Sequence, residues 1–571
     1  MPSAFTPPPA FTTRPTLQGT FGMAATTHWI ATATAQSVLE RGGNAFDAAT
    51  AAGFVLHVVE PHLNGPGGDM PAIFATADAP GEPVVLMGQG PAPAAASLEH
   101  YRGLGLTLVP GAGALAAAVP GAVDAWLLLL RDHGTWDVAD VLAYAIGYAR
   151  DGHPVLPATC RTIAVVEDLF RTYWPTSAAQ WLSGGRVPRP GELVRNEAYA
   201  RTLERLAAAA GTGDRESRID AVRTEWREGF VAATASAFAA VPHWHSDGGT
   251  YAGVITPDDF AAFRASYEPA VTAEFRGHTI AKTGPWGQGP ALLQMLTILD
   301  GLEDARLDPS TAVGAHTVLE VLKLALADRD AYYGDDDGAR SALDVLLSPG
   351  YAAQRRALIG ETASAELRPG TVPGREPFRP PLREHVDEHA AGVGEPTVSP
   401  TGEQRGDTCH IDVVDRWGNM ISATPSGGWL QSSPTIPELG FALGTRLQMM
   451  WLEEGAASSL APGRRPRTTL TPTLVLRDGQ SVTALGSPGG DQQDQWQLLY
   501  LLRTIVGGYS PQQAIDAPAF HTRSMPDSFW PRTWDPARAV VEDRLGEDVI
   551  AELERRGHRV TRAGAWSLGR L

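Results

Sequence analysis

The stretch Asp407-Thr408-Cys409-His410-Ile411-Asp412-Val413-Val414-Asp415 decides both the fold and the chemistry expected of this chain. Its apolar and polar residues alternate, as is typical of a strand, and it directly follows a polar run rich in Pro and Gly. A threonine hydroxyl is a weak nucleophile, but cleavage of the chain before Thr408 would give the same residue a free α-amine as general base. Because an α-amine titrates at about 7.7–8.0, it can accept a proton near neutral pH. The stretch therefore predicts a threonine that becomes an N-terminus.

Composition limits the partners that such a chain can have. Its 571 residues are enough for three or four domains of about 150 residues, or for one large unit of helices and strands. The 46 basic and 64 acidic residues give a net charge of −18, which argues against nucleic acid and anionic membranes as partners. The only cysteines are Cys160 and Cys409, which argues against a disulfide framework.

The start of the chain, Met1-Pro2-Ser3-Ala4-Phe5, lacks the basic region and apolar run of a secretory signal. No apolar stretch reaches the length of about 18 residues that a membrane-spanning helix needs. We therefore expect a cytoplasmic protein without a membrane partner.

Hydrophobic periodicity divides the chain into two parts joined by a linker. In the first part, Asn44 is expected to cap a helix over residues 45–60 that stops at Pro61. Further helices are predicted over residues 121–132, 138–150, 196–210, 291–301 and 311–333, and strands over residues 72–77 and 83–87. Residues 1–20 are expected to be disordered, and residues 366–407 to form an exposed, mobile linker.

The second part of the chain differs from the mainly helical first part, because it begins with paired strands. Residues 408–415 and 420–424 flank the turn residues Gly418-Asn419, and residues 473–477 and 481–485 flank Asp478-Gly479. The second hairpin leads into Gly486-Ser487-Pro488-Gly489-Gly490 and then a helix through about residue 505. Strand pairs in both parts, with helices outside them, predict an α+β fold: a four-layer αββα sandwich of two antiparallel sheets.

Several motifs, in order along nearly the whole chain, resemble the γ-glutamyltransferase family. They are Gly42-Gly43-Asn44-Ala45-Phe46-Asp47-Ala48-Ala49, Asn64-Gly65-Pro66-Gly67-Gly68-Asp69, Ala327-Asp328-Arg329 with Tyr333-Gly334-Asp335, the Thr408 segment and Gly486–Gly490. The resemblance implies an N-terminal-nucleophile hydrolase that cleaves itself between Asp407 and Thr408. One αββα domain would then consist of a large subunit, residues 21–407, and a small subunit, residues 408–571. Family members usually continue past a Gly-His-x-Val strand, here Gly557-His558-Arg559-Val560, into two final core strands that residues up to Leu571 do not supply.

The resemblance also assigns catalytic roles. Thr408 matches the family's nucleophile, with an ordinary strand threonine as the alternative. Ser426 falls where the family has a hydroxyl that hydrogen-bonds the nucleophile, although a serine after Pro425 can also be a turn residue. Cys409 is the rival nucleophile, since a thiol is intrinsically more reactive, but a small buried strand residue is the competing interpretation.

Two glycine-rich segments have different expected roles. Gly489 and Gly490 match the pair whose backbone amides bind the oxyanion of the tetrahedral intermediate, and this assignment rests on the resemblance alone, because a plain turn would look the same. Gly65-Pro66-Gly67-Gly68 could be mistaken for a phosphate loop, but it lacks the Lys-Ser/Thr of that motif.

The sequence departs from the family's pattern at positions that would bind the substrate. The family's arginine for the donor α-carboxylate aligns with Gln89, and its asparagine after the second hydroxyl with Gly428. The aspartate that pairs with the donor α-ammonium aligns with Met449, and the usual serine pair with Thr468 and Thr469. Losing an arginine and an aspartate would weaken γ-glutamyl binding by about two to four orders of magnitude.

The replacement residues suggest a different pocket. Trp429, Met449, Met450 and Trp451 make that side more apolar, which suits a bulkier or less zwitterionic substrate. Arg446 stands where the family usually has glutamine, and Arg446 and Arg467 are either relocated carboxylate anchors or surface arginines.

We expect neither a metal nor another cofactor. His243-Trp244-His245 lacks partners at metal-ligand spacing and is interpreted as a solvated loop. Asp328 and Arg329 are interpreted as structural ion-pair residues rather than catalytic groups.

The sequence thus favours hydrolysis of a small-molecule amide through an acyl-Thr408 intermediate, with water or an amine releasing the acyl group. Three alternatives stay open. One is a true γ-glutamyltransferase with a rebuilt pocket. Another is a C–C bond hydrolase: the resemblance extends to relatives in actinobacterial natural-product pathways that cleave a C–C bond next to a carbonyl in proline-derived building blocks, and the apolar pocket is compatible with that reaction. The last is a processed but inactive scaffold or binding protein.

Overall fold

Two antiparallel sheets stack face to face in the computed structural model, which describes residues 5–384 and 408–571. The first sheet has the order β1 (Gly22–Thr26), β11 (Ile411–Asp415), β12 (Met420–Ala423), β2 (Ala72–Ala75), β3 (Val84–Met87) and β8 (Ser266–Pro269). The second has the order β14 (Gln480–Leu485), β13 (Thr473–Arg477), β10 (His278–Lys282) and β9 (Val271–Phe275). The Ser422 hydroxyl of β12 donates to the Leu485 carbonyl of β14 across 3.0 Å, so an inner strand of the first sheet is linked to an edge strand of the second.

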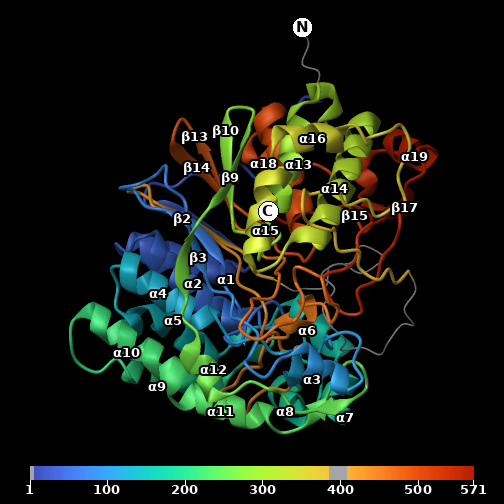
Figure 1. The fold of residues 1–571 in the computed structure, drawn as a ribbon. Helices are drawn as coiled ribbons and strands as arrows, with labels where there is room; N and C mark the ends of the chain where they lie inside the picture. Colours follow the sequence, from blue (N-terminus) through green and yellow to red (C-terminus); the bar gives the residue numbers. More distant parts are fainter. Residues whose placement is uncertain (1–4, 385–407) are drawn as a thin grey trace.

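Helices cover the outer face of each sheet (Figure 1). The first sheet is covered by α1 (Trp29–Glu40), α2 (Ala45–Val59) and α4 (Ala122–His133), with α5 (Val138–Asp151) packed outside them. The second is covered by α13 (Pro290–Asp300) and α17 (Gln493–Leu501), with α14 (Ala312–Tyr332) packed against α13. The predicted αββα sandwich is therefore confirmed.

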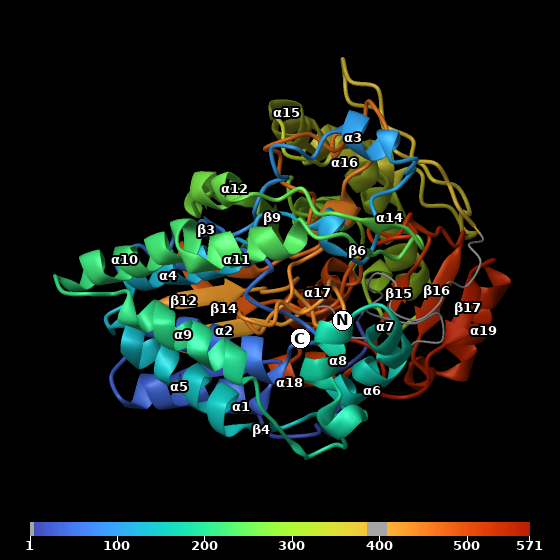
Figure 2. The ribbon, with the colours of Figure 1, turned by 90° about the horizontal axis from the view of Figure 1, so that it is seen from below.

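The remaining elements surround this sandwich. They are α3 (Leu98–Gly103), α6 (Pro157–Val165), α7 (Glu167–Thr172), α8 (Pro175–Trp181), α9 (Glu197–Ala208), α10 (Arg215–Glu228), α11 (Phe230–Ala239), α12 (Pro257–Ala262), α15 (Asp337–Leu346), α16 (Pro349–Arg356), α18 (Pro511–Asp516) and α19 (Glu547–Arg555). Short strand pairs are β4 (His153–Pro154) with β5 (Leu193–Val194), and β6 (His243–Trp244) with β7 (Thr250–Tyr251). Figure 2 shows α19 beside a third sheet of β15 (Phe520–Thr522), β16 (Arg538–Val541) and β17 (Arg559–Arg562). None of the described helices is long and apolar enough to cross a membrane.

The predicted helices and strands are present with ends shifted by a few residues. The Asn44 side chain accepts from the backbone amides of Phe46 and Asp47, and Asp47 accepts from the amide of Asn44. This reciprocal capping box fixes the start of α2, and the helix ends at Val59, two residues before Pro61.

Two segments predicted to be disordered or exposed contact the rest of the fold through a few residues, while most of their other described residues are exposed or half-buried. In the N-terminal segment the Phe5 side chain is buried, and Thr13 donates from its amide and hydroxyl to Asp516. In the first part of the linker, Val372 is buried and Gly370 donates to Asp328 on α14. Both segments lack hydrophobic periodicity, so the sequence pattern could not predict these few contacts. The rest of the predicted linker, residues 385–407, lies outside the described residues.

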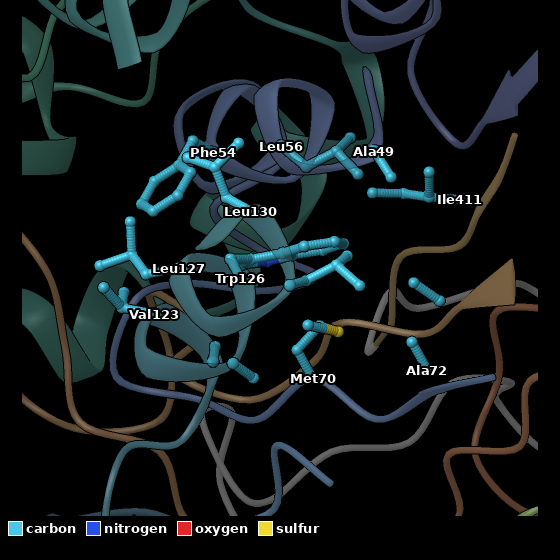
Figure 3. Close-up of a cluster of buried hydrophobic side chains, with 14 of the residues drawn as sticks. Ala49, Phe54, Leu56, Met70, Ala72, Val123, Trp126, Leu127, Leu130 and Ile411 are labelled. Carbon is cyan, nitrogen blue, oxygen red and sulfur yellow. The ribbon is translucent and has the colours of Figure 1, made fainter. Parts of the chain in front are cut away.

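The core beneath the first sheet is built around Trp126 of α4. Figure 3 shows its ring between Phe54 and Leu56 on one side and Met70 and Ala72 on the other. A Cβ atom on Gly53 would lie 2.5 Å from this ring, so the glycine lets α2 and α4 approach closely. This packing supports β2 and β12 from behind, because both strands belong to the same buried cluster.

We predict that Trp126→Ala lowers the free energy of unfolding by about 3–5 kcal/mol, because the surrounding helices cannot fill the space left by a fully buried indole. Urea denaturation followed by far-UV circular dichroism measures the change. Trp29→Ala is the matched control, since its side chain is 65% exposed and its removal should change stability by about 0.5 kcal/mol or less. Equal denaturation midpoints for the two variants would contradict the packing argument.

Candidate active site

The structure brings the predicted hydroxyl pair together at the start of the second part of the chain. Thr408 and Ser426 form an antiparallel bridge, and their side-chain oxygens lie 3.3 Å apart. Both residues are buried, and the Cys409 amide donates to the Pro425 carbonyl across 2.9 Å. The nucleophile candidate thus lies shortly before β11 and is held by the segment that follows β12. Asp407 lies outside the described residues.

The Cys409 thiol has its own buried surroundings. Its sulfur lies 3.2 Å from the Glu60 carboxylate and 3.1 Å from the Asn64 amide nitrogen, both near the end of α2. Successive side chains of an extended segment point to opposite sides, so Cys409 faces α2 while Thr408 faces Ser426. This geometry favours the interpretation of Cys409 as a buried structural residue.

The glycine motif Gly65–Gly68 packs against the segment that carries Ser426. A Cβ atom on Gly68 would lie 2.1 Å from the Ser426 carbonyl oxygen, and one on Gly65 would lie 2.4 Å from that of Gly428. The amides and carbonyls of Asp69 and Ser426 exchange hydrogen bonds of 2.8 and 2.9 Å. The glycines therefore allow two backbones to touch, which explains the motif without a phosphate ligand.

The predicted oxyanion loop joins β14 to α17. Gly489 has a φ of +118°, which disfavours any residue with a side chain, and the Gly490 carbonyl accepts from the Gln288 amide at 3.4 Å. At the start of the loop, a Cβ atom on Gly486 would lie 2.0 Å from the His410 ring, two residues beyond Thr408. The loop is thus packed onto the strand that Thr408 begins.

Of the predicted substrate residues, Arg446 does not act as a free group. Arg446 donates from Nη2 to the Asp69 carboxylate at 2.8 Å, and both side chains are buried. Burial raises the pKa of Asp69, and the neighbouring Arg446 guanidinium opposes this rise. Arg446, Gln89 and Asp69 line one small cavity of about 10 Å³, while Gly428 packs against Gly67 and Gly68. Arg446 is therefore neither a surface arginine nor an unpaired cation.

The other predicted substrate residues lie on neighbouring loops. Met449 forms a buried apolar cluster with Trp429 and Phe529. The Thr468 amide donates to the Trp286 carbonyl at 2.9 Å, and the buried Thr469 hydroxyl has no hydrogen-bond partner among the described residues. Arg467, next to them, is 1% exposed, so it is also not a surface arginine.

Some residues around the site were not singled out by sequence reasoning. They are Gln288, Asp491, Ser528 and Arg532: Gln288 donates to the Gly490 carbonyl, Ser528 to the Asp491 carboxylate and Arg532 to the Gln448 carbonyl. Asp69 ends the first glycine motif but was given no role, and Asp491 directly follows the second motif, which was its available signal. The other three come from segments without a local pattern, and only tertiary structure brings them here.

The structure identifies the ion-pair partners of Asp328 and Arg329, and it corrects the expected exposure of His245. Asp328 and Arg329 both form ion pairs as expected, but with other partners: Asp328 with Arg355 at 3.2 Å, and Arg329 with Asp330 at 3.0 Å. His245 is buried rather than solvated, because its Nε2 accepts from the Leu115 amide at 2.9 Å. The ring therefore serves as a structural acceptor inside the fold.

One group of side chains in the described part of the chain has atoms close enough for a metal ion: His316, Glu320 and His558. The Glu320 carboxylate already pairs with Lys323 and, at 3.0 Å, with Arg368. Two cations on the only anionic ligand make this group a poor divalent-cation site.

Comparisons with known proteins find similar sequences and similar structures. The sequence model of the gamma-glutamyltranspeptidase family matches residues 31–571. The glutathione hydrolase-like YwrD proenzyme of Bacillus subtilis is 30% identical over 552 residues, 96% of this chain and 92% of the relative. The oxamate amidohydrolase proenzyme of Klebsiella pneumoniae is 31% identical, with 95% and 91% covered. A solved structure described as LmbA2991HD superposes with a TM-score of 0.92 at 54% identity, with 98% and 95% covered.

We predict that Arg446→Gln lowers the free energy of unfolding by about 3–5 kcal/mol at pH 7, because it leaves the Asp69 carboxylate buried without its cation. The folded-state pKa of Asp69 would then rise further, so the folded state binds more protons and the loss should shrink as pH falls toward that pKa. Adding Asp69→Asn should recover most of the loss. Urea denaturation of the two single variants and the double variant measures these changes.

Arg102→Gln serves as the control for this cycle, since its ion pair with Glu454 is exposed and should contribute about 1 kcal/mol or less. Additive losses in the Arg446→Gln/Asp69→Asn double variant would show that the two side chains do not depend on each other.

Proposed function

The chain belongs to the gamma-glutamyltranspeptidase family, and on this premise we propose that it is a self-processing hydrolase that cleaves a small-molecule amide through an acyl-Thr408 intermediate. The observation that carries the proposal is the contact of 3.3 Å between the Thr408 and Ser426 hydroxyls, at the first described residue after the linker. The relatives named above are proenzymes, in keeping with a chain that matures by cleavage.

Maturation would use the same hydroxyl that later acts on the substrate. The Thr408 Oγ attacks the carbonyl carbon of Asp407, the C–N bond of the peptide breaks, and the proton passes to the released amine. This leaves an ester between Asp407 and the Thr408 side chain, which water hydrolyses to a carboxylate and a free hydroxyl. Ser426 is placed to orient the Thr408 hydroxyl in both steps.

In the mature enzyme the Thr408 α-amine would be the general base. It takes the hydroxyl proton as Oγ attacks the substrate amide, and it returns a proton to the leaving amine. The amides of Gly489 and Gly490 would stabilise the oxyanion, where one such donor contributes about 2.7–4 kcal/mol. Water then attacks the acyl ester and releases the acid.

The two fragments would stay together after cleavage because their strands alternate in one sheet. The pair β11 and β12 lies between β1 and β2, with registers of Ala24 against Val413 and Ile73 against Ser422. Separating the fragments would therefore break the sheet and expose its core, so we propose a stable complex of residues up to 407 with residues 408–571.

The substrate is proposed to differ from an ordinary γ-glutamyl compound. Gln89 and Met449 stand where the resemblance implies an arginine and an aspartate, and Arg446 is neutralised by Asp69. The apolar group of Trp429, Met449 and Phe529 has no carboxylate to pair with an ammonium group. A donor without an α-ammonium group fits these residues best.

We predict that purified wild-type protein splits into two fragments, the smaller beginning at Thr408, and that Thr408→Ala stays a single chain. Intact-mass spectrometry with N-terminal sequencing gives both results. Cys409→Ala is the matched control and should be cleaved, because its thiol faces Glu60. A wild-type chain that stays whole, or a Cys409→Ala chain that alone fails to split, would overturn the assignment and favour the scaffold or a cysteine nucleophile.

We predict that kcat/KM for glutaryl-p-nitroanilide is equal to or higher than that for γ-glutamyl-p-nitroanilide, which differs only by its α-amino group. Met449 cannot form an ion pair with that ammonium group, so no ion pair offsets the free-energy cost of removing the ammonium from water. Release of p-nitroaniline measures both rates, with Thr408→Ala as the blank. A preference for the γ-glutamyl compound of about 100-fold or more would instead indicate a true γ-glutamyltransferase.

A further inference from the structure

Lysine is almost absent from this chain, and both of its lysines are buried. Of the 46 lysine and arginine residues, only Lys282 and Lys323 are lysine. Their exposed fractions are 0% and 4%, although a lysine is seldom fully buried unless it is paired. Lys282 pairs with Asp494 at 3.2 Å, and Lys323 pairs with Glu320. The chain thus uses lysine only where the cation lies inside the fold.

The Lys282 ammonium group joins β10, α17 and the segment that leads into β13. Lys282 is the last residue of β10, and its Nζ donates to the Thr471 carbonyl at 3.0 Å and to the Thr473 hydroxyl at 2.6 Å. On α17, Nζ donates to the Gln497 side-chain oxygen at 3.2 Å and lies 3.2 Å from Asp494. Thr471 also bonds Asp494 and Gln497 directly, at 2.7 and 3.0 Å. The ammonium group is therefore the centre of a closed polar network.

Each of these three segments is continuous with a loop of the candidate active site. The segment before β13 carries Thr468, α17 follows the Gly489-Gly490 loop, and β10 leads into the loop of Gly287 and Gln288. The last loop contacts the other two, because Gly287 forms a bridge with Thr468 and Gln288 donates to the Gly490 carbonyl at 3.4 Å. The Lys282 network is thus the common base of the three loops.

The surroundings of the Lys282 side chain suit a charged lysine. A Cβ atom on Gly289 would lie 3.0 Å from the lysine Cε and 3.1 Å from its Cβ, so the backbone at the start of α13 touches the unbranched stem. Four oxygen atoms lie within 3.2 Å of Nζ, and an ammonium group has three N–H donors for them. The planar, forked guanidinium of an arginine has a different donor geometry and would not reproduce these contacts.

Burial makes this ammonium group titratable near neutral pH. It lowers the pKa of Lys282 to about 8, and the attraction of Asp494, the charged group that faces it, opposes this change. Burial also raises the pKa of Asp494, and Lys282 and Arg329 of α14 oppose that rise. Tyr333 lies near Asp494 as well, and burial keeps its phenol neutral by raising its pKa. Because four oxygens surround Nζ, the pair is ionised at pH 7 and Lys282 loses its proton as the pH rises.

We propose that Lys282 is a positioning residue, whose ammonium group holds the Thr468 segment against α17 and so fixes the distance between Thr468 and the Gly489-Gly490 loop. This rests on the proposed function, because these loops are the ones assigned to the Thr408 chemistry. Lys282 acts through the loops and does not touch the substrate, since its side chain is 0% exposed. A displacement of about 1 Å between reacting groups can lower a rate by about 100-fold, so loosening this network should slow catalysis.

Removal of both charges tests this role against a merely structural one. Lys282→Met/Asp494→Asn leaves no unpaired buried charge, so its thermal midpoint should stay close to that of wild type. Its kcat/KM for the glutaryl and γ-glutamyl anilides should nevertheless fall by about 10- to 100-fold. Lys323→Met/Glu320→Gln removes the other buried lysine pair, on α14, and should leave both rates unchanged. Wild-type rates in Lys282→Met/Asp494→Asn, or an equal loss in both double variants, would overturn the proposal.

The pH dependence of turnover gives a readout that needs no substitution at Lys282. Protein labelled with ¹³C at lysine Cε has one such site in each of its two lysines, and Lys323→Met/Glu320→Gln leaves only the Lys282 signal. The pH at which this signal titrates should match an alkaline fall of kcat in wild type. The Thr408 α-amine causes no such fall, because a general base is active when deprotonated. A kcat that stays constant while Lys282 titrates would count against the proposal.

Hydrogen exchange separates failure of this proposal from failure of the proposed function, because it does not need turnover. Backbone amides of residues 468–473 and 486–492 should exchange faster in Lys282→Met/Asp494→Asn than in wild type, and at the wild-type rate in Lys323→Met/Glu320→Gln. If they do so but wild type hydrolyses neither anilide, the role of Lys282 in holding the loops stands and the proposed amide hydrolysis fails. If wild type hydrolyses an anilide but exchange and kcat/KM are unchanged in Lys282→Met/Asp494→Asn, hydrolysis stands and the positioning role fails.

Discussion

The pairing of β11 and β12 between β1 and β2 is the constraint on which the rest of the structure depends. A strand in the middle of a sheet has both backbone edges occupied, so its first residue is held more firmly than one on a loop. Thr408 is bridged to Ser426 immediately before β11 begins, and Ser426 is bridged in turn to Asp69. The position of the Thr408 hydroxyl is therefore a consequence of backbone pairing, and side-chain contacts only refine it.

Glycine residues let the segment before Asp69 lie very close to the segment that carries Ser426. Gly67 and Gly68 lie against the backbones of residues 442–443 and 426–427, where any Cβ atom would overlap a carbonyl oxygen. The close approach puts the Asp69 side chain within reach of Arg446, so a buried ion pair stands directly behind the Ser426 turn. Such a pair contributes less to net stability than its Coulomb energy suggests, because both charges leave water. Its clearer effect is to fix the conformation of residues 426–428.

Much of this arrangement follows from the sequence, and the remainder shows where local patterns stop being informative. The helix at Asn44, the strand at Ile411 and the hairpin at Asp478-Gly479 are set by capping, alternation and turn residues, which act over a few positions. The closeness of Thr408 and Ser426 was predicted only through the family resemblance. The partners of Arg329 and Arg446 were not, because they lie 162 and 377 positions away in the chain. Burial of Phe5 and Val372 was missed for the same reason, since each depends on a distant surface.

The charges near the site differ in how completely they are balanced. Arg446 has one carboxylate to itself, so the surroundings of Gln89 and Gly428 are electrically neutral. Arg329, Arg467 and Arg532 share two carboxylates, so the far side of the apolar cluster is positive. A chain selected for stability alone would gain by replacing a surplus buried arginine with an apolar residue of similar volume. Here the arginines donate to neutral groups as well, Arg467 to the Ser528 hydroxyl at 2.8 Å and Arg532 to the Gln448 carbonyl at 2.8 Å. The apolar cluster of Trp429, Met449 and Phe529 lies between the two sides, because Arg446 stands 5.5 Å from the Trp429 ring and Ser528, which accepts from Arg467, directly precedes Phe529.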